Sequence, residues 1–137
     1  MIRTYLNAMF IMLSRIYADK NKNSPQFSYD LLQLNRYEAL VDIHFKEHRP
    51  VSFYSDKMNI SDRQLSYLCK KTVNKTPSEI LTERIILEAK RLIIHSDLSI
   101  FSISRQLNYN DDSYFIRLFK KISNQTPEQF RNAQYKQ

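Results

Sequence analysis

The chain has 137 residues with a hydrophobic content of 42%, which is enough for one domain with a packed core and excludes a compositionally disordered protein. Its formal net charge of +7 favours an anionic partner without identifying one. The single cysteine, Cys69, excludes an intramolecular disulfide, and no apolar run is long enough to span a bilayer, so a cytoplasmic protein without a membrane segment is expected.

Two helices are predicted in the N-terminal third. Apolar residues recur at intervals of three and four over residues 2–17, which is the pattern of one helical stripe. The polar residues 19–28 read as a loop. A second helix is expected over residues 29–48, and it ends there because Arg49 precedes Pro50 and the residue before a proline is pushed out of helical geometry.

A first helix–turn–helix unit is predicted over about residues 52–72. Its first helix covers residues 52–58, and Asn59 and Ile60 form the turn. Ser61 then begins the second helix with Gln64 three residues later. This spacing is a capping box, in which each side chain satisfies a backbone N–H group of the other residue.

A long linker helix and a second helix–turn–helix unit follow. The linker is expected over about residues 77–95 and the second unit over about residues 100–122, with Asp111 as the cap of its second helix. Two further capping boxes, at residues 76–79 and 126–129, begin the linker and the last helix. No segment has the pattern of a strand, so the predicted fold is all-α.

Part of the first unit returns fifty residues later. Residues 65–80 and 115–130 align without a gap. The identical pairs are Leu68/Leu118, Lys70/Lys120, Lys71/Lys121, Asn74/Asn124, Thr76/Thr126 and Pro77/Pro127. A basic helix that is built twice at a fixed separation is typical of proteins that bind duplex DNA.

The chain contains no glycine, although turns and helix ends usually need a residue that tolerates positive φ. Asparagine is the next best residue for this conformation. Asn59 and Asn108 stand at the two turns, and Asn74 and Asn124 stand at the two helix ends. We therefore expect all four asparagines to be left-handed.

The pattern over about residues 35–133 resembles the DNA-binding domain of the AraC/XylS family of bacterial transcription regulators. The resemblance rests on residues 84–94, 103–109, 115–121 and 124–131. It implies two helix–turn–helix motifs bridged by a linker helix, sequence-specific binding to double-stranded DNA, no cofactor, and RNA polymerase as a candidate partner. The four asparagines replace glycines that are usual in the family.

The resemblance also suggests how the chain is divided. Ser55 and Ser104 occupy positions where the family has a small alanine between the two helices of each motif, so the size is preserved. Residues 1–34 resemble the helical end of the family's sensory domain, and we expect them to form a helical segment that is either a remnant of that domain or a segment for homodimerisation. Residues 35–137 are predicted to form the DNA-binding domain.

Helical spacing selects the candidate contact residues of each recognition helix. Leu65, Leu68 and Cys69 point inward in the first unit, as do Phe115, Leu118 and Phe119 in the second. The candidate base-reading residues are Arg63, Gln64, Ser66 and Tyr67 in the first unit and Asp112, Ser113, Ile116 and Arg117 in the second. The candidate phosphate contacts are Lys70, Lys71, Lys120 and Lys121.

The chemistry of these residues fits base edges and phosphates. Arg63 and Arg117 can each donate two hydrogen bonds to a guanine, and Ile116 can contact a thymine methyl group. A linker of about eighteen residues spans roughly 27 Å, against about 34 Å between successive major grooves. We therefore expect the two recognition helices to enter successive major grooves.

Several of these residues also have an alternative that involves no DNA. Each lysine pair lies at a helix C-terminus, where it complements the helix dipole. The arginines can form surface salt bridges, and Tyr67 can pack over the linker helix. Asp111 and Asp112 oppose phosphate at the start of the second recognition helix. They leave open a protein-interaction or dimerisation module with weakened DNA binding.

A metallopeptidase is the remaining alternative. Residues 44–48 fit the pattern H-x-x-E-H, which places two histidines on one helical face. A zinc site needs a third protein ligand, and the sequence supplies none at a suitable spacing. There is also no nucleophile–base pair and no phosphate-binding glycine loop. We therefore expect no metal site and no enzymatic activity.

Overall fold

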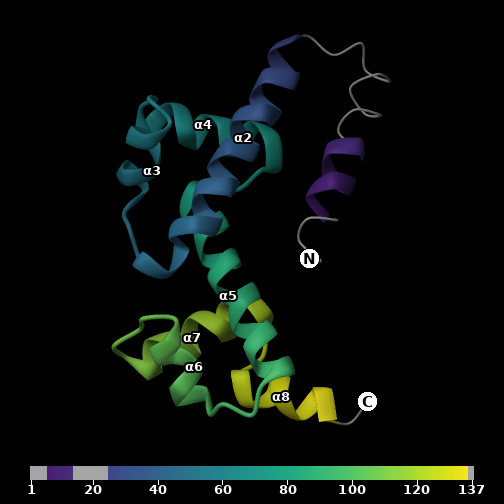
Figure 1. Cartoon of the computed structure of the whole chain (residues 1–137), viewed down its shortest axis with the longest axis vertical. Coiled ribbons are helices and arrows are strands. Elements are labelled where there is room, and N and C mark those ends of the chain that lie inside the picture. Colours follow the sequence, from purple (N-terminus) through teal and green to yellow (C-terminus); the bar gives the residue numbers. More distant parts are fainter. Residues whose placement is uncertain (1–5, 14–24, 136–137) are drawn as a thin grey trace.

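The computed structural model describes residues 6–13 and 25–135, and all regular structure within these residues is helical (Figure 1). A helix over residues 6–13 comes first. It is followed by α2 (Pro25–His44), the 3-10 helix η1 (Phe45–Glu47), α3 (Val51–Lys57), α4 (Asp62–Val73), α5 (Pro77–His95), α6 (Ile100–Gln106), α7 (Asp112–Ser123) and α8 (Pro127–Tyr135). The prediction of an all-α fold is confirmed.

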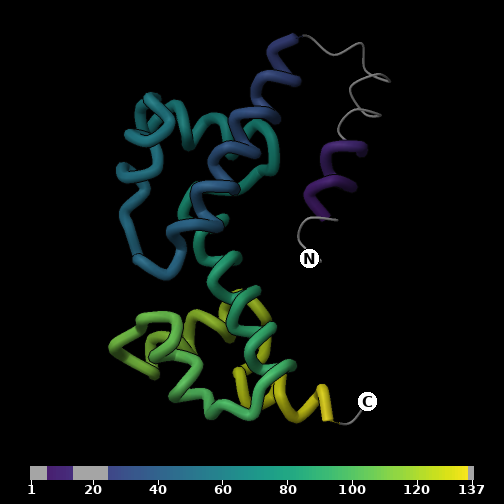
Figure 2. Tube along the Cα trace, in the orientation of Figure 1, coloured from purple at the N-terminus to yellow at the C-terminus, as the bar shows by residue number. Residues whose placement is uncertain are grey.

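The helix α5 joins two groups of helices that lie at its two ends (Figures 1 and 2). In the upper group of Figure 1, α5 contacts α2, η1 and α4, and in the lower group it contacts α6, α7 and α8. Each group contains one helix–turn–helix pair, α3 with α4 and α6 with α7. The linker helix predicted from the sequence is therefore the spine of the molecule.

The core of the first group is built from one face each of α2 and α4. Leu34, Tyr37 and Val41 of α2 are fully buried together with Leu65 and Cys69 of α4. Burial raises the pKa of the Cys69 thiol to about 12, so this cysteine is a packing residue, as predicted. Each apolar side chain of this size stabilises the fold by about 1.5–3 kcal/mol when it is buried.

The core of the second group repeats this arrangement. Ile103 of α6 and Phe115 and Phe119 of α7 are fully buried, and they belong to the same hydrophobic cluster as the buried Ala89 of α5. Ser104 is also fully buried, and its counterpart Ser55 in the first group is nearly so. Small side chains at these two positions allow the two helices of each motif to approach closely.

The predicted helix caps determine where the elements begin. The Ser61 hydroxyl accepts the Gln64 N–H group at 3.1 Å while the Gln64 side chain accepts the Ser61 N–H group at 2.9 Å. The same reciprocal pair joins Thr126 and Gln129 at the start of α8. At the start of α5 the Thr76 hydroxyl accepts a backbone N–H group at 3.1 Å. These bonds satisfy N–H groups that have no partner within the helix.

The four asparagines adopt the left-handed conformation, as predicted. Their φ angles are 57° at Asn59, 56° at Asn74, 63° at Asn108 and 61° at Asn124. A fifth residue, His48, also has a positive φ of 54° and ends η1, which the sequence pattern did not indicate. The chain thus makes its turns and helix ends without glycine.

The predicted bounds of the second helix were wrong at both ends. The helix α2 begins at Pro25, because proline is suited to the first position of a helix, whereas we expected a loop there. It ends at His44, and the chain continues as η1 to the left-handed His48. The helix also runs through the predicted domain boundary at residues 34 and 35. The division of the chain at that point stays a prediction.

The first predicted helix is described only in part. Residues 6–13 are helical, and the rest of the predicted stripe over residues 2–17, with most of the following loop, lies outside the described residues. Among the residues that the structure describes, no helix is both long and apolar enough to cross a membrane.

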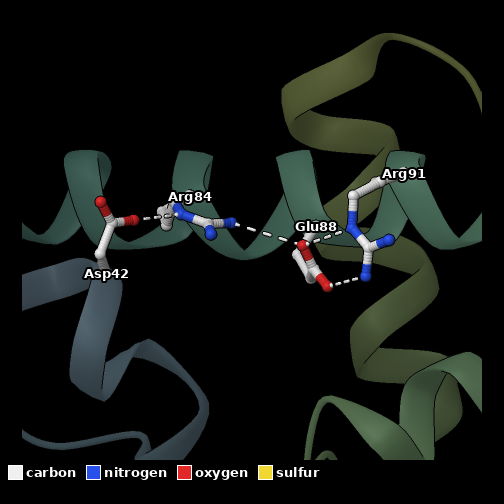
Figure 3. Close-up of polar contacts among 4 residues, drawn as sticks. All are labelled: Asp42, Arg84, Glu88 and Arg91. Atoms are coloured by element: carbon white, nitrogen blue, oxygen red, sulfur yellow. Dashed lines mark hydrogen bonds and ion pairs between the residues drawn. The ribbon is translucent and has the colours of Figure 1, made fainter. Parts of the chain in front are cut away.

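A line of charged residues runs along α5 from the first group of helices toward the second (Figure 3). The Arg84 Nε group donates to Asp42 of α2 at 2.8 Å, and Arg84 Nη1 lies 3.8 Å from the Glu88 carboxylate. Glu88 is buried and accepts two hydrogen bonds from Arg91, the shorter of them 2.6 Å long. These bonds hold the pKa of Glu88 below its usual range.

Candidate nucleic-acid interface

The helix α4 presents a polar face opposite its buried one. Arg63, Ser66, Tyr67 and Lys70 are all exposed, and they share one side of the helix. The Tyr67 side chain is 66% exposed, so it is not buried against the linker helix, which was the alternative for this residue. The structure therefore brings these four predicted contact residues together.

Two other predicted contacts on α4 are engaged within the protein. The Gln64 side-chain oxygen serves the capping box, which leaves the amide nitrogen as the group that can face a base. Lys71 Nζ lies 2.9 Å from Asp30 of α2, and the hydrogen bond to Asp30 raises the pKa of Lys71. Both lysines are exposed, and Lys71 differs from Lys70 in this ion pair with Asp30.

The helix α7 presents the matching face in the second unit. Ser113, Arg117, Lys120 and Lys121 are exposed. Ile116 is half-buried and packs against the core, so only part of its side chain is available to a base. The same helical positions thus face outward in both units, although the residues at those positions differ.

The acidic residues near the start of the recognition helices hold the motifs together. The Asp62 carboxylate accepts the Ser55 hydroxyl, and the Asp112 carboxylate lies 3.9 Å from Arg105 Nε of α6. Asp111 accepts the N–H group of Ser113 at 2.9 Å as the cap of α7. These contacts give Asp62, Asp111 and Asp112 a structural role within their motifs.

Sequence reasoning missed two side chains beside these faces. Tyr114 is 50% exposed on α7, and it corresponds to Gln64 in the repeat, so the offset of fifty residues could have identified it. Tyr29 is exposed on the first turns of α2, and it lines a cavity of about 370 Å³ together with Arg63 and Tyr67. No signal in the sequence places α2 beside α4.

The histidines of the H-x-x-E-H pattern are not arranged as metal ligands. His44 is the last residue of α2, and His48 lies beyond η1 in a left-handed conformation, so the two do not share a helical face. His44 contacts the Glu47 carboxylate, and His48 Nε2 lies 2.7 Å from the Leu107 carbonyl oxygen. Within the described part of the chain, no group of three or more histidine, cysteine, aspartate or glutamate side chains is placed to hold a metal ion.

A comparison with known families matches residues 54–133, more than half of the chain, to a helix-turn-helix domain family. The matched residues begin within α3 and contain α4, the linker α5 and the second helix pair α6 and α7. The chain belongs to the AraC family of helix-turn-helix transcription regulators. The resemblance stated from the sequence is thereby confirmed, and DNA is the partner that membership of the AraC family implies.

Curated relatives and solved structures are also similar to this chain. The chain is 28% identical over 101 residues to the transcriptional activator RhaS of Citrobacter koseri, with 74% of this chain and 36% of RhaS covered. It is 27% identical to the C-terminal domain of the response regulator yesN from Fusobacterium nucleatum, with a TM-score of 0.63 and 69% of this chain and 93% of that domain covered. An AraC-type regulator from Chromobacterium violaceum shares the fold, with a TM-score of 0.72 at 20% identity over 78% of this chain and 96% of that one. The chain spans about a third of the length of the curated relatives it matches.

Proposed function

We propose that this chain binds duplex DNA sequence-specifically by inserting α4 and α7 into successive major grooves. The observation that carries the proposal is that one helix joins two exposed basic helices, which present the same positions outward. With 19 residues, α5 is about 28 Å long at 1.5 Å per residue, against about 34 Å between successive grooves. Modest bending of the DNA would close the difference.

Each contact type has a role in the proposal. Arg63 and Arg117 read guanine edges, and the exposed part of Ile116 contacts a thymine methyl group. Lys70, Lys120 and the other exposed lysines neutralise phosphates and set the register. Because the outward residues of the two helices differ, the preferred site is asymmetric.

A salt titration tests this function. Binding to genomic fragments is measured with the full chain over a series of salt concentrations. We expect log affinity to fall linearly with log salt, and selected fragments to bind at least about a thousandfold more tightly than bulk DNA. Affinity that hardly changes with salt, or no fragment that outcompetes bulk DNA, would refute sequence-specific binding.

A second candidate function is self-association through the helix over residues 6–13, because this helix exposes a row of large apolar side chains. Met9 and Met12 are 57% and 62% exposed. Burial of such side chains in a dimer is favourable. We expect the change of Met9 and Met12 to aspartate to shift sedimentation from dimer to monomer, whereas Asn7→Asp does not. A wild-type chain that sediments as a monomer would refute the dimer.

Activity in transcription is part of the same proposal. A regulator that binds chromosomal DNA acts in the cytoplasm, and RNA polymerase is the partner through which such a regulator changes transcription. Transcription in vitro from a template that carries the preferred site tests this step. A transcript level that is unchanged by the protein would contradict it.

A further inference from the structure

The first group of helices and the second are hydrogen bonded to each other away from α5. His48 Nε2 lies 2.7 Å from the carbonyl oxygen of Leu107, and Asn108 Nδ2 donates to the carbonyl oxygen of Lys46 at 2.9 Å. The His48 and Asn108 partners are 59 and 62 residues apart in the sequence. One loop of the first group is thus bound to the turn of the second helix–turn–helix pair.

The two loops that meet in this way are both held in defined conformations. His48 and Asn108 are left-handed; His48 directly follows η1, and Asn108 follows Leu107, the residue that caps the end of α6. The His48 ring packs edge-on against Tyr109, with 4.6 Å between the ring centroids, and Tyr109 is itself buried against Phe115 of α7. Tyr109 thus connects the His48 ring to the recognition helix by direct ring contacts.

The surroundings of this junction are open. A cavity of about 260 Å³ lies between the two groups, and its lining includes Phe45, Leu81, Tyr109, Tyr114 and Leu118. Because apolar side chains do not fill this space, close packing alone does not fix how the two groups are oriented here. The hydrogen bonds of His48 and Asn108 at the edge of the cavity restrain the bending of the molecule about α5.

We propose that His48 and Asn108 are positioning residues that set the spacing between the two halves of the DNA site. This inference rests on the proposed function, because it concerns the distance and rotation between α4 and α7. One base pair moves a half-site by about 3.4 Å along the duplex and by about 34° around it. A rigid protein binds a site of altered spacing much more weakly, whereas a protein that bends about α5 loses less affinity for that site.

The test measures affinity for the preferred site and for sites with one base pair inserted or removed between the halves. Asn108→Gly removes the amide and keeps the left-handed conformation, and Asn108→Asp keeps the shape but cannot donate to Lys46. His48→Asn removes the ring. For each variant we compare the affinity for the preferred site with the affinity for a site of altered spacing. We expect the ratio of these two affinities to fall about fivefold relative to the wild type, because one net hydrogen bond changes an equilibrium constant by about that factor.

The control is Asn124→Gly, which makes the same substitution at a left-handed residue that does not lie at the junction. We expect this variant to discriminate between the spacings as the wild type does. Folded Asn108→Gly and Asn108→Asp variants with wild-type discrimination would overturn the spacing role and leave the proposed function intact. A wild-type chain without salt-dependent, site-selective binding would overturn both.

Discussion

At the scale of single residues, chemically alike side chains acquire different roles from their surroundings. Lys71 and Lys121 are equivalent in the repeat and both are exposed, but Lys71 forms an ion pair with Asp30 of α2, a residue that has no counterpart beside Lys121 in the repeat. Asp62 and Asp112 are also equivalent, and both are bound to the preceding helix of their motif. The contacts of a residue therefore decide which charges are available to DNA.

The ion pair between Lys71 and Asp30 predicts that Lys71 and Lys121 contribute differently to the salt dependence of DNA binding. We expect Lys121→Ala to weaken binding to all DNA sequences alike and to reduce the slope of log affinity against log salt by about one. Lys71→Ala should change that slope less, because Asp30 already binds its ammonium group. Salt titrations of the two variants on one DNA site check this. Equal changes in slope would show that Lys71 leaves Asp30 to contact phosphate.

The exposed arginines predict a loss of base discrimination. Arg63→Ala and Arg117→Ala should each cost about 1–3 kcal/mol on the preferred site and relax the preference at one base pair. Binding to single-base variants of that site is the measurement. Arg36→Ala, which removes an exposed arginine on α2, is the control and should leave the preference unchanged. Equal losses on all sequences would reassign the two arginines to phosphate.

At the scale of elements, left-handed asparagines end helices that would usually end in glycine. The Asn74 N–H group donates to the Lys70 carbonyl oxygen at 3.1 Å, and the Asn124 N–H group donates to the Lys120 carbonyl oxygen at 2.8 Å. These bonds satisfy carbonyl groups of the last helical turn, and the positive φ of each asparagine then turns the chain away from the helix axis. Helix ends of this kind fix the direction in which the chain leaves each recognition helix.

The left-handed conformation of Asn74 predicts how substitutions at this position change the free energy of unfolding. The left-handed conformation costs about 1 kcal/mol for a residue that has a Cβ atom and no polar side chain to compensate. Asn74→Ala should therefore lower the free energy of unfolding by about that amount. Asn74→Gly should leave the free energy unchanged or raise it. Urea unfolding of both variants checks this, with Asn110→Ala as a control outside the left-handed positions. The opposite ranking would contradict the role of Asn74 as a helix end.

At the scale of the whole molecule, polar contacts join the first group of helices to α5, and a further ion pair lies within α5 itself. Asp42 binds Arg84 at one end of the charged line on α5, while Glu88 binds Arg91 toward the other end (Figure 3). The Tyr37 hydroxyl donates to the Pro77 carbonyl oxygen at 2.7 Å, which ties α2 to the start of α5. These contacts orient the spine relative to the helices that it carries.

The lowered pKa of Glu88 predicts a pH-dependent contribution to stability. A carboxyl with a lowered pKa in the folded state stabilises that state above its ordinary pKa of 4.5 and loses this contribution as the pH falls through the lowered value. Glu88→Gln should therefore cost about 2 kcal/mol at about pH 7 and much less at about pH 3.5. Urea unfolding at the two pH values measures the difference. A cost that does not depend on pH would show that the charge of Glu88 is not what stabilises the fold.

Much of the fold could be predicted because local signals agree with each other. From Ser61 onward the ends of the helices are located by capping boxes, by prolines at helix starts and by left-handed asparagines. On α4, the spacing of Leu65, Leu68 and Cys69 separates the buried face from the exposed face. The signals failed at Pro25 and His48. Proline is common both in loops and at the first position of a helix, and His48 contacts Leu107, 59 residues away, which no local pattern indicates.

The sequence by itself determined the helical architecture, the duplication, the family and the side of each recognition helix that faces outward. These properties depend on interactions between residues only a few positions apart, and such interactions leave a periodic pattern. Only the tertiary structure decided that Asp30 binds Lys71 and that His48 meets Leu107, since each pair joins residues that are far apart in the chain. Long-range pairing leaves no local pattern, because it depends on how the helices pack around α5.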